Sequence, residues 1–239
     1  MNKVILICLA GISLFFYACA QKNNEEKKFT ESFSSDSCRF VTEGRNTYFI
    51  LEPGYQLILE GTEGNKKTRL EITVLNETKK VRNIETRIVE ENESVNGETI
   101  EISRNFFALC KETGSVYYFG EEVDMYKNGK VVSHEGAWIA EARLPDGQGK
   151  NKAGIIMPGE VLIGARYYQE IAPGIAMDRA EIISNEETLT TPAGKFNGCL
   201  KVEETTPLEP KAKEYKYHAP GIGLIKDGNL VLIKYGFKN

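Results

Sequence analysis

Apolar and polar side chains alternate at every second position in several stretches of this 239-residue chain, and this period constrains the fold more than any other feature. Leu70, Ile72 and Val74 alternate with polar neighbours, and Ile100 and Ile102 do the same. A period of two places one face of a β-strand in a core and the other in water. Further segments rich in aromatic or β-branched residues, which favour strands, are 115–119, 200–202 and 230–234.

Turn signals fall between these segments. Asn96-Gly97, Asn128-Gly129 and Asp227-Gly228 supply the positive φ values of a type I′ hairpin turn. Four of the eight prolines precede glycine, a pair that suits a type II turn. No segment of the mature chain carries a sustained helical stripe. We therefore expect a mainly β fold, an antiparallel meander forming one sandwich or curved half-barrel, with very little helix apart from the signal segment.

The N-terminus is typical of an export signal. Lys3 is followed by an apolar run over residues 4–18, which has the length of a signal-peptide core. The run ends at Ala18-Cys19, which resembles a lipobox, although Phe16 stands where that pattern has an aliphatic residue. We predict a lipoprotein signal peptide over 1–18 and lipidation of Cys19 with palmitate-type acyl chains. Ordinary cleavage after Ala20 is the alternative.

Composition divides the remainder. Residues 19–37 are polar and charged, so they predict a flexible tether. Residues 38–239 are long enough to form a single β domain with its own core. Together these features predict an exported protein, lipid-anchored to the bacterial cell envelope and facing the periplasm or the cell surface. The membrane is then a partner through the anchor.

Charge argues against nucleic acid as a partner. The net charge is −4, and the 30 basic and 34 acidic residues are interspersed without a basic stripe.

Three cysteines remain once Cys8 and Cys19 are set aside. Cys110 and Cys199 lie in strand-like contexts, so we favour a disulfide between Cys110 and Cys199, with Cys38 free. The absence of any bridge is equally compatible with the sequence, because buried cysteine also packs as a small hydrophobe. The spacing does not fit a zinc ribbon.

Several segments, taken in order, resemble an uncharacterised family of exported bacterial β-rich proteins of unknown function. They are residues 46–49, 52–55, 118–124, 156–159, 168–170, 173–174, 178–181, 191–196, 206–210 and 217–224. This resemblance implies export but no activity and no site residues. The run from 191–196 to the turn at 220–224 is also similar to parts of LolA-like half-barrels, which implies a fold only.

Few residues are candidates for metal binding or catalysis. Glu121, Glu122 and Asp124 could bind a hard cation, but the following Asn-Gly turn favours a solvated hairpin. His134-Glu135 could suit acid–base chemistry, yet neighbours on a strand point to opposite faces. His218 is more typical of a packing residue at a strand end. We predict no enzyme activity and assign no catalytic, cofactor-binding or metal residues.

Aromatic residues give the remaining functional signal. They gather at 117–119, 167–168 and 215–217, with Trp138 as the only tryptophan. An aromatic sheet interior could line an apolar cavity, although ordinary core packing also explains the pattern. Our first hypothesis is a binding module for a lipid or another apolar or amphiphilic ligand. The alternatives are a structural or protein-interaction lipoprotein with envelope partners, and a hydrolase whose site carries no motif.

Overall fold

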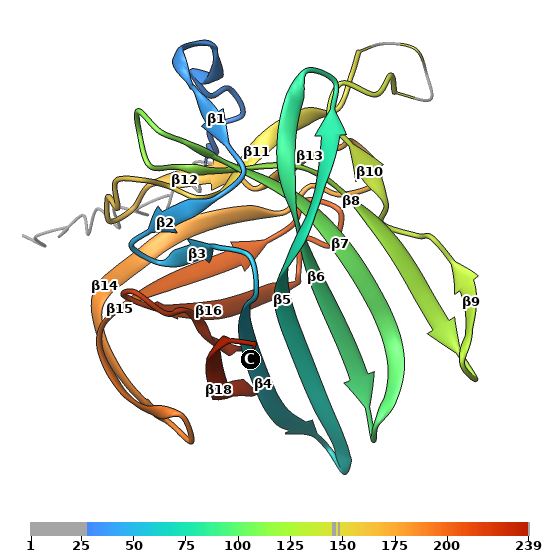
Figure 1. Cartoon of the computed structure of the whole chain (residues 1–239), viewed down its shortest axis with the longest axis vertical. Helices are drawn as coiled ribbons and strands as arrows, with labels where there is room; N and C mark the ends of the chain where they lie inside the picture. The colour runs from blue at the N-terminus through green and yellow to red at the C-terminus, as the bar shows by residue number, and fades with distance from the viewer. Residues whose placement is uncertain (1–27, 145–146, 148, 239) are drawn as a thin grey trace, which may run out of the picture.

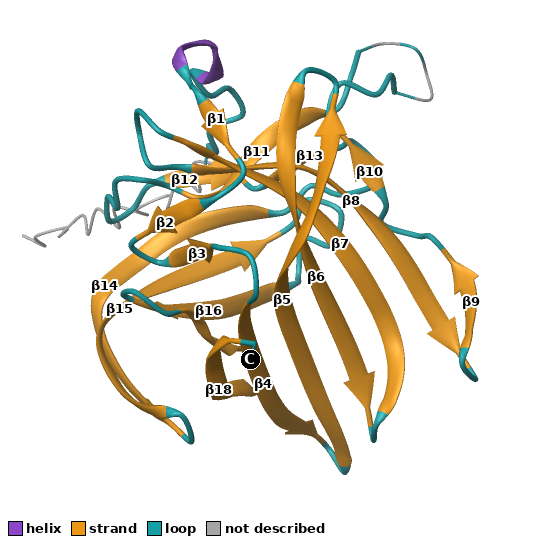
Figure 2. Cartoon of the chain, in the orientation of Figure 1, coloured by secondary structure: helices purple, strands orange, loops and turns teal. Residues whose placement is uncertain are grey.

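The computed structural model describes residues 28–144, 147 and 149–238, and nearly all of the regular structure in them is antiparallel β-strand. The one helical element in these ranges is a 3₁₀ turn, η1, at Ser35–Ser37 (Figure 2). The strands form a curved half-barrel that is nearly closed (Figure 1). The predicted fold class is therefore confirmed, and the sheet takes the half-barrel form.

The strands follow one another along the chain with these bounds: β1 Phe40–Val41, β2 Gly44–Asn46, β3 Phe49–Leu51, β4 Tyr55–Glu63, β5 Lys66–Val81, β6 Ile84–Val95, β7 Glu98–Cys110, β8 Val116–Lys127, β9 Lys130–Ser133, β10 Trp138–Ile139, β11 Lys152–Met157, β12 Arg166–Tyr168, β13 Glu170–Ile171, β14 Arg179–Thr191, β15 Gly194–Thr205, β16 Lys213–Ala219, β17 Gly223–Asp227 and β18 Leu230–Phe237.

Two meanders make up the sheet. Strands β4 to β8 follow one another in space as in sequence, and so do β14 to β18. The last strand, β18, pairs with β4 and joins the two meanders. The Asn-Gly hairpins occur as predicted, with positive φ at Asn96 and Asn128. The third hairpin turns one residue later than predicted, because Asp227 pairs with Leu230 and leaves Gly228 and Asn229 as the loop.

The sheet closes through one short segment that changes partners. The strand order begins with β12 and ends with β13, yet these two strands are consecutive in the chain. Strand β12 pairs with β14, whereas β13 pairs with β11 on the other side. Gln169 lies at the change, and its N–H and that of Glu170 both donate to the backbone carbonyl of Asp178. One segment of the chain thus joins both ends of the sheet.

Close packing at this junction requires a glycine. A Cβ on Gly154 of β11 would overlap the backbone carbonyl of Gln169. Any larger residue at position 154 would push β11 away from the closing segment.

A hairpin covers one end of the half-barrel. Strands β2 and β3 pair only with each other in the described chain. The Asn46 side chain donates 2.9 Å hydrogen bonds to the carbonyls of Gly114 and Pro158, which fixes the hairpin to the β8 and β11 side. The phenol of Tyr48 bonds to the Gly198 carbonyl of β15 on the opposite side. Ile50 and Leu51 are buried below these contacts, so the hairpin packs as a cover on the core.

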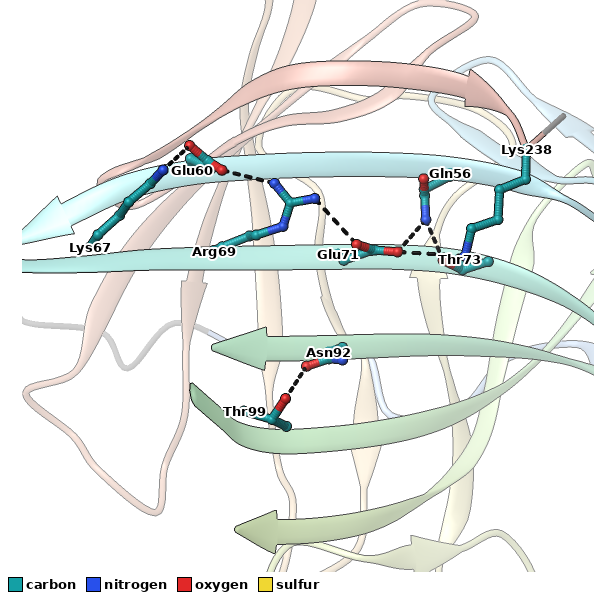
Figure 3. Close-up of polar contacts among 9 residues, drawn as sticks. All are labelled: Gln56, Glu60, Lys67, Arg69, Glu71, Thr73, Asn92, Thr99 and Lys238. Atoms are coloured by element: carbon teal, nitrogen blue, oxygen red, sulfur yellow. Dashed lines mark hydrogen bonds and ion pairs between the residues drawn. The ribbon is translucent and has the colours of Figure 1, made fainter. Parts of the chain in front are cut away.

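The outer face of the first meander is polar. On β4 and β5, Arg69 lies between Glu60 and Glu71, and Gln56 contacts both Glu71 and Thr73 (Figure 3). These side chains alternate with inward-facing aliphatic ones, as the period of two predicts. The Arg69 ion pairs are partly buried, and Gln56 and Thr73 are buried, so this polar network packs against the sheet.

The predicted disulfide partner was wrong. Cys38 is bonded to Cys110, and Cys199 is free and buried. Strand β1, which begins two residues after Cys38, pairs with the end of β7 and brings the two sulfurs together. Cys199 lies on β15 in the second meander, and its thiol packs as a small hydrophobe.

Part of the predicted tether is ordered against the sheet. Thr30 forms a parallel bridge with Tyr167 through 3.0 Å backbone hydrogen bonds. The Phe29 ring packs on Tyr168 at 6.0 Å, with the Arg179 guanidinium 4.4 Å from its centre. The flexible-tether prediction is therefore wrong for these positions, where aromatic residues give the segment a surface to bury. The signal peptide over 1–18, Cys19 and the rest of the tether to residue 27 lie outside the described residues.

The disulfide gives a test of the pairing. The bonded cysteines are 72 positions apart, so the bridge removes much loop entropy from the unfolded chain and should stabilise the fold by about 2–4 kcal/mol. We expect a reductant to lower the free energy of unfolding of the wild type by this amount in urea titrations. Cys38→Ser should lose the same stability and become insensitive to the reductant. If Cys38→Ser stays sensitive to the reductant, the bridge joins other cysteines.

Candidate functional site

A cavity of about 310 Å³ lies inside the half-barrel. Its walls come from both meanders, from the closing segment and from the β2–β3 hairpin. The apolar lining is Phe49, Ile50, Tyr55, Leu57, Ile72, Val74, Val89, Phe107, Ile156, Met157, Val202, Ile222 and Leu224. This volume is at the lower end of the range for small-molecule sites, which are concave and mostly apolar.

The lining changes from apolar to acidic along the strands. On β7 the inward residues, in order from the hairpin cover, are Phe107, Asn105, Ser103 and Glu101. The Phe107 ring packs against Phe49 of the cover at 5.3 Å. On β6, Val89 is followed by Glu91 in the same direction. Along β6 and β7 the lining is therefore apolar near the cover and polar farther along, whereas β5 stays apolar at the level of Glu91, which pairs with Ile72. We call the carboxyl-lined part the polar end.

Acidic groups outnumber basic ones in this lining. Six carboxyl side chains reach the cavity, from Glu91, Glu101, Glu121, Glu170, Asp178 and Glu204, against Lys216 and His218. Most of these side chains remain partly exposed, although protein surrounds them, because the cavity itself gives access to water.

Lys216 is held by an ion-pair network within the sheet. Its ammonium lies 2.8 Å from Glu204 and 3.6 Å from Asp227. The other oxygen of Glu204 accepts a 2.8 Å hydrogen bond from Gln169, at the closing segment. Burial disfavours both charged groups, but their mutual attraction is the larger effect. The pKa of Glu204 is therefore below its usual value, and that of Lys216 is above its usual value.

The remaining carboxyls hold protons more tightly than free carboxyls do. Burial, with the repulsion of neighbouring carboxylates, raises the pKa of Glu91 and that of Glu121 to about 7. The same causes raise the pKa of Glu170 well above its usual value. Glu91 and Glu121 are therefore partly protonated near neutral pH, and a small change in their surroundings changes the charge of the polar end.

His218 lies beside the hairpin cover, at the other end of the lining. Burial lowers the pKa of its imidazole to about 4, so the ring is neutral at physiological pH. A hydrogen bond to the backbone of Tyr48 favours the protonated ring, so a ring N–H donates there. The Nδ1 atom is buried and has no hydrogen-bond partner in the described structure. Nδ1 is thus an unpaired acceptor that is closed off from solvent.

The acidic residues singled out in the sequence do not converge. Glu121 lines the cavity, whereas Glu122 points outward to Lys79 at 2.7 Å. Asp124 binds Arg104 and lies 3.0 Å from His134 on the outer face. These contacts explain the segment as a solvated strand, and no group of three or more His, Cys, Asp or Glu in the described ranges is arranged to hold a metal ion.

The aromatic prediction holds in part. Tyr118 lines the cavity, while Tyr117 packs on Phe40 at 5.1 Å on the opposite side of the strand. Tyr167 and Tyr168 are both buried, contrary to simple alternation, because the Phe29 segment covers Tyr168. Trp138 packs on Tyr118 at 5.3 Å and does not line the cavity.

Sequence reasoning missed most of the polar end. Glu91 and Glu101 sit in strands of alternating pattern, and Lys216 and His218 sit together on β16. The signal that could have found them is polarity at inward positions: Glu101 and Ser103 alternate with the outward Ile100 and Ile102, which reverses the usual order. The sequence was interpreted as if the apolar face always pointed inward.

No protein-family model, curated protein or solved structure matches this chain. The resemblance to exported bacterial proteins and to half-barrel carriers gains no support from these comparisons and stays a prediction. No helix in the described ranges has the length and hydrophobicity needed to span a bilayer.

The raised carboxyl pKa values predict an inverse dependence of stability on pH. Between about pH 4.5, the unfolded value, and about pH 7, the folded chain binds more protons at Glu121 than the unfolded chain does. The free energy of unfolding must then fall as pH rises through this window. As pH rises from 5 to 8, the free energy of unfolding of Glu121→Gln should increase by about 1–3 kcal/mol relative to that of the wild type. Urea unfolding at the two pH values measures this difference.

Glu122→Gln, on the outward face of the same strand, serves as the control and should shift stability by less than about 1 kcal/mol at both pH values. An equal pH response in Glu121→Gln and wild type would show that Glu121 does not titrate with a raised pKa.

Proposed function

We propose that the described domain is a binding module that holds one apolar or amphiphilic small molecule in the cavity of the half-barrel. The observation that carries the proposal is an unfilled interior whose lining is aliphatic and aromatic at one end and polar at the other. A fold that served only as a scaffold would be expected to fill this space, because each lost contact and each buried carboxyl costs stability.

The same proposal includes the cellular location of the protein. We propose an exported protein, anchored through Cys19 to the bacterial envelope, with the domain in the periplasm or at the surface. The lipobox-like Ala18-Cys19 and the apolar run before it support this location. The Cys38–Cys110 bond supports it as well, since disulfides persist in oxidising compartments.

A protein-interaction module is the second candidate. Strand β9 lies at an edge and, among the described strands, pairs only with β8. Its Val131 and Val132 are 43% and 61% exposed. An exposed edge with apolar side chains is the kind of surface that can add a strand from a partner.

An uncharged probe tests ligand binding directly. Decanol, measured by isothermal titration, should bind with one-to-one stoichiometry. Ile72→Trp should abolish that binding, because Ile72 lines the cavity and is only half-buried, so the larger ring has space to enter.

Ile102→Trp is the matched control. Ile102 is also half-buried on a strand of the same wall, but it faces away from the cavity between Glu101 and Ser103. Its variant should bind decanol as the wild type does. Absence of decanol binding in the wild type, or equal loss in both variants, would favour the interaction module.

Anchoring is tested separately. The full chain, expressed in a bacterial host fed with radiolabelled palmitate, should incorporate label and sediment with membranes. Cys19→Ser should lose the label and become soluble. Label retained in Cys19→Ser would contradict lipidation at this residue.

A further inference from the structure

The polar end of the cavity has more negative than positive groups, and its position relative to the apolar end restricts the ligand. The one lysine in the lining is already engaged by Glu204 and Asp227. Glu91, Glu101 and Glu121 have no ion pair with a basic side chain in the described structure. Any occupant that brings a positive charge would relieve their mutual repulsion.

We propose that the ligand is a cationic amphiphile, with one protonated amine bound at the polar end and an apolar body against Phe107 and the hairpin cover. The proposal rests on the binding function above and names the chemical class of its ligand.

The hydrogen-bonding capacity of the site fits an ammonium group. An ammonium has three donors and no acceptor, so it needs acceptors from several directions. Glu91 on β6 and Glu101 on β7 supply carboxylates from one meander. Glu121 on β8 supplies a third carboxyl from the next strand. An anionic ligand would find no free basic side chain in the lining, because Lys216 is already engaged by Glu204 and Asp227.

The cavity also limits the length of the ligand. Its volume of about 310 Å³ lies at the lower end of the range for small-molecule sites, so we choose single-chain probes. Decylamine, decanol and decanoate have the same chain and differ only in the charge of the head group, so they form a matched series of probes.

Binding of a cation should release protons. The charged groups that act on Glu91 come from the strands around it and are Glu101, Glu121, Glu204, Lys216 and Asp227. Glu170, Asp178 and His218 line the same cavity. Because burial raises the pKa of Glu91 to about 7, an ammonium nearby must lower it. Amine affinity should therefore increase as pH rises from 5.5 to 8, and decanol affinity should not.

The experiment is isothermal titration of the protein with the three probes at pH 7.5. Decylamine should bind about tenfold more tightly than decanol, which corresponds to about one charge-assisted hydrogen bond, and decanoate should bind more weakly than decanol. Repeating the decylamine titration in buffers with different ionisation enthalpies should detect release of up to about one proton.

Glu91→Gln removes the central carboxyl and should reduce the preference for decylamine over decanol to about threefold or less, without weakening decanol. Glu90→Gln, on the outward face beside it, loses only a half-buried ion pair with Arg104 and should retain the full preference. The Glu91 variant loses a group whose burial is costly, so it should fold.

The outcomes separate the two proposals. Equal affinity for all three probes would leave the binding function intact and overturn the cationic class. Tighter binding of decanoate, or displacement of decylamine by Mg²⁺ alone, would also overturn it and indicate an anionic ligand or a metal. Absence of binding by every probe would contradict both proposals.

Discussion

The pairing of one segment, residues 166–171, with two different strands determines the rest of the structure. Strand β12 pairs with β14, and β13 pairs with β11. The two edges of a sixteen-stranded sheet are therefore joined by consecutive residues of the chain. The junction depends on close backbone approach at Gly154 and on the Asp178 carbonyl. Without it the sheet would have two open edges, and the interior would be an exposed face and not a cavity.

The interior combines groups that work against stability. Buried carboxyl groups cost free energy unless they are protonated or paired, and here both solutions occur. Lys216 pairs with Glu204, which is tied to the closing segment through Gln169. Glu91 and Glu121 instead keep a raised pKa near 7. Chains that keep such costly groups at one place commonly do so for function, which is the basis of both proposals.

Local patterns predicted the strands but not their closure. The alternation around Ile72 and the Asn96-Gly97 turn indicated antiparallel hairpins, and the structure contains them. The partner change at Gln169 depends on contacts between distant parts of the chain, which no local pattern encodes. The disulfide prediction was wrong for the same reason, because strand character alone does not show that β1 pairs with the end of β7. The inward carboxyls were missed because polarity was interpreted as exposure to bulk water.

A ligand held in the half-barrel should be visible by native mass spectrometry of the full chain. The protein would be exported to a bacterial envelope, extracted gently and transferred to a volatile buffer before measurement. We expect a single bound species of small-amphiphile mass that is lost on denaturation and is absent from Ile72→Trp. A bare protein mass for the wild type, or the same adduct in both proteins, would contradict a ligand held in the cavity.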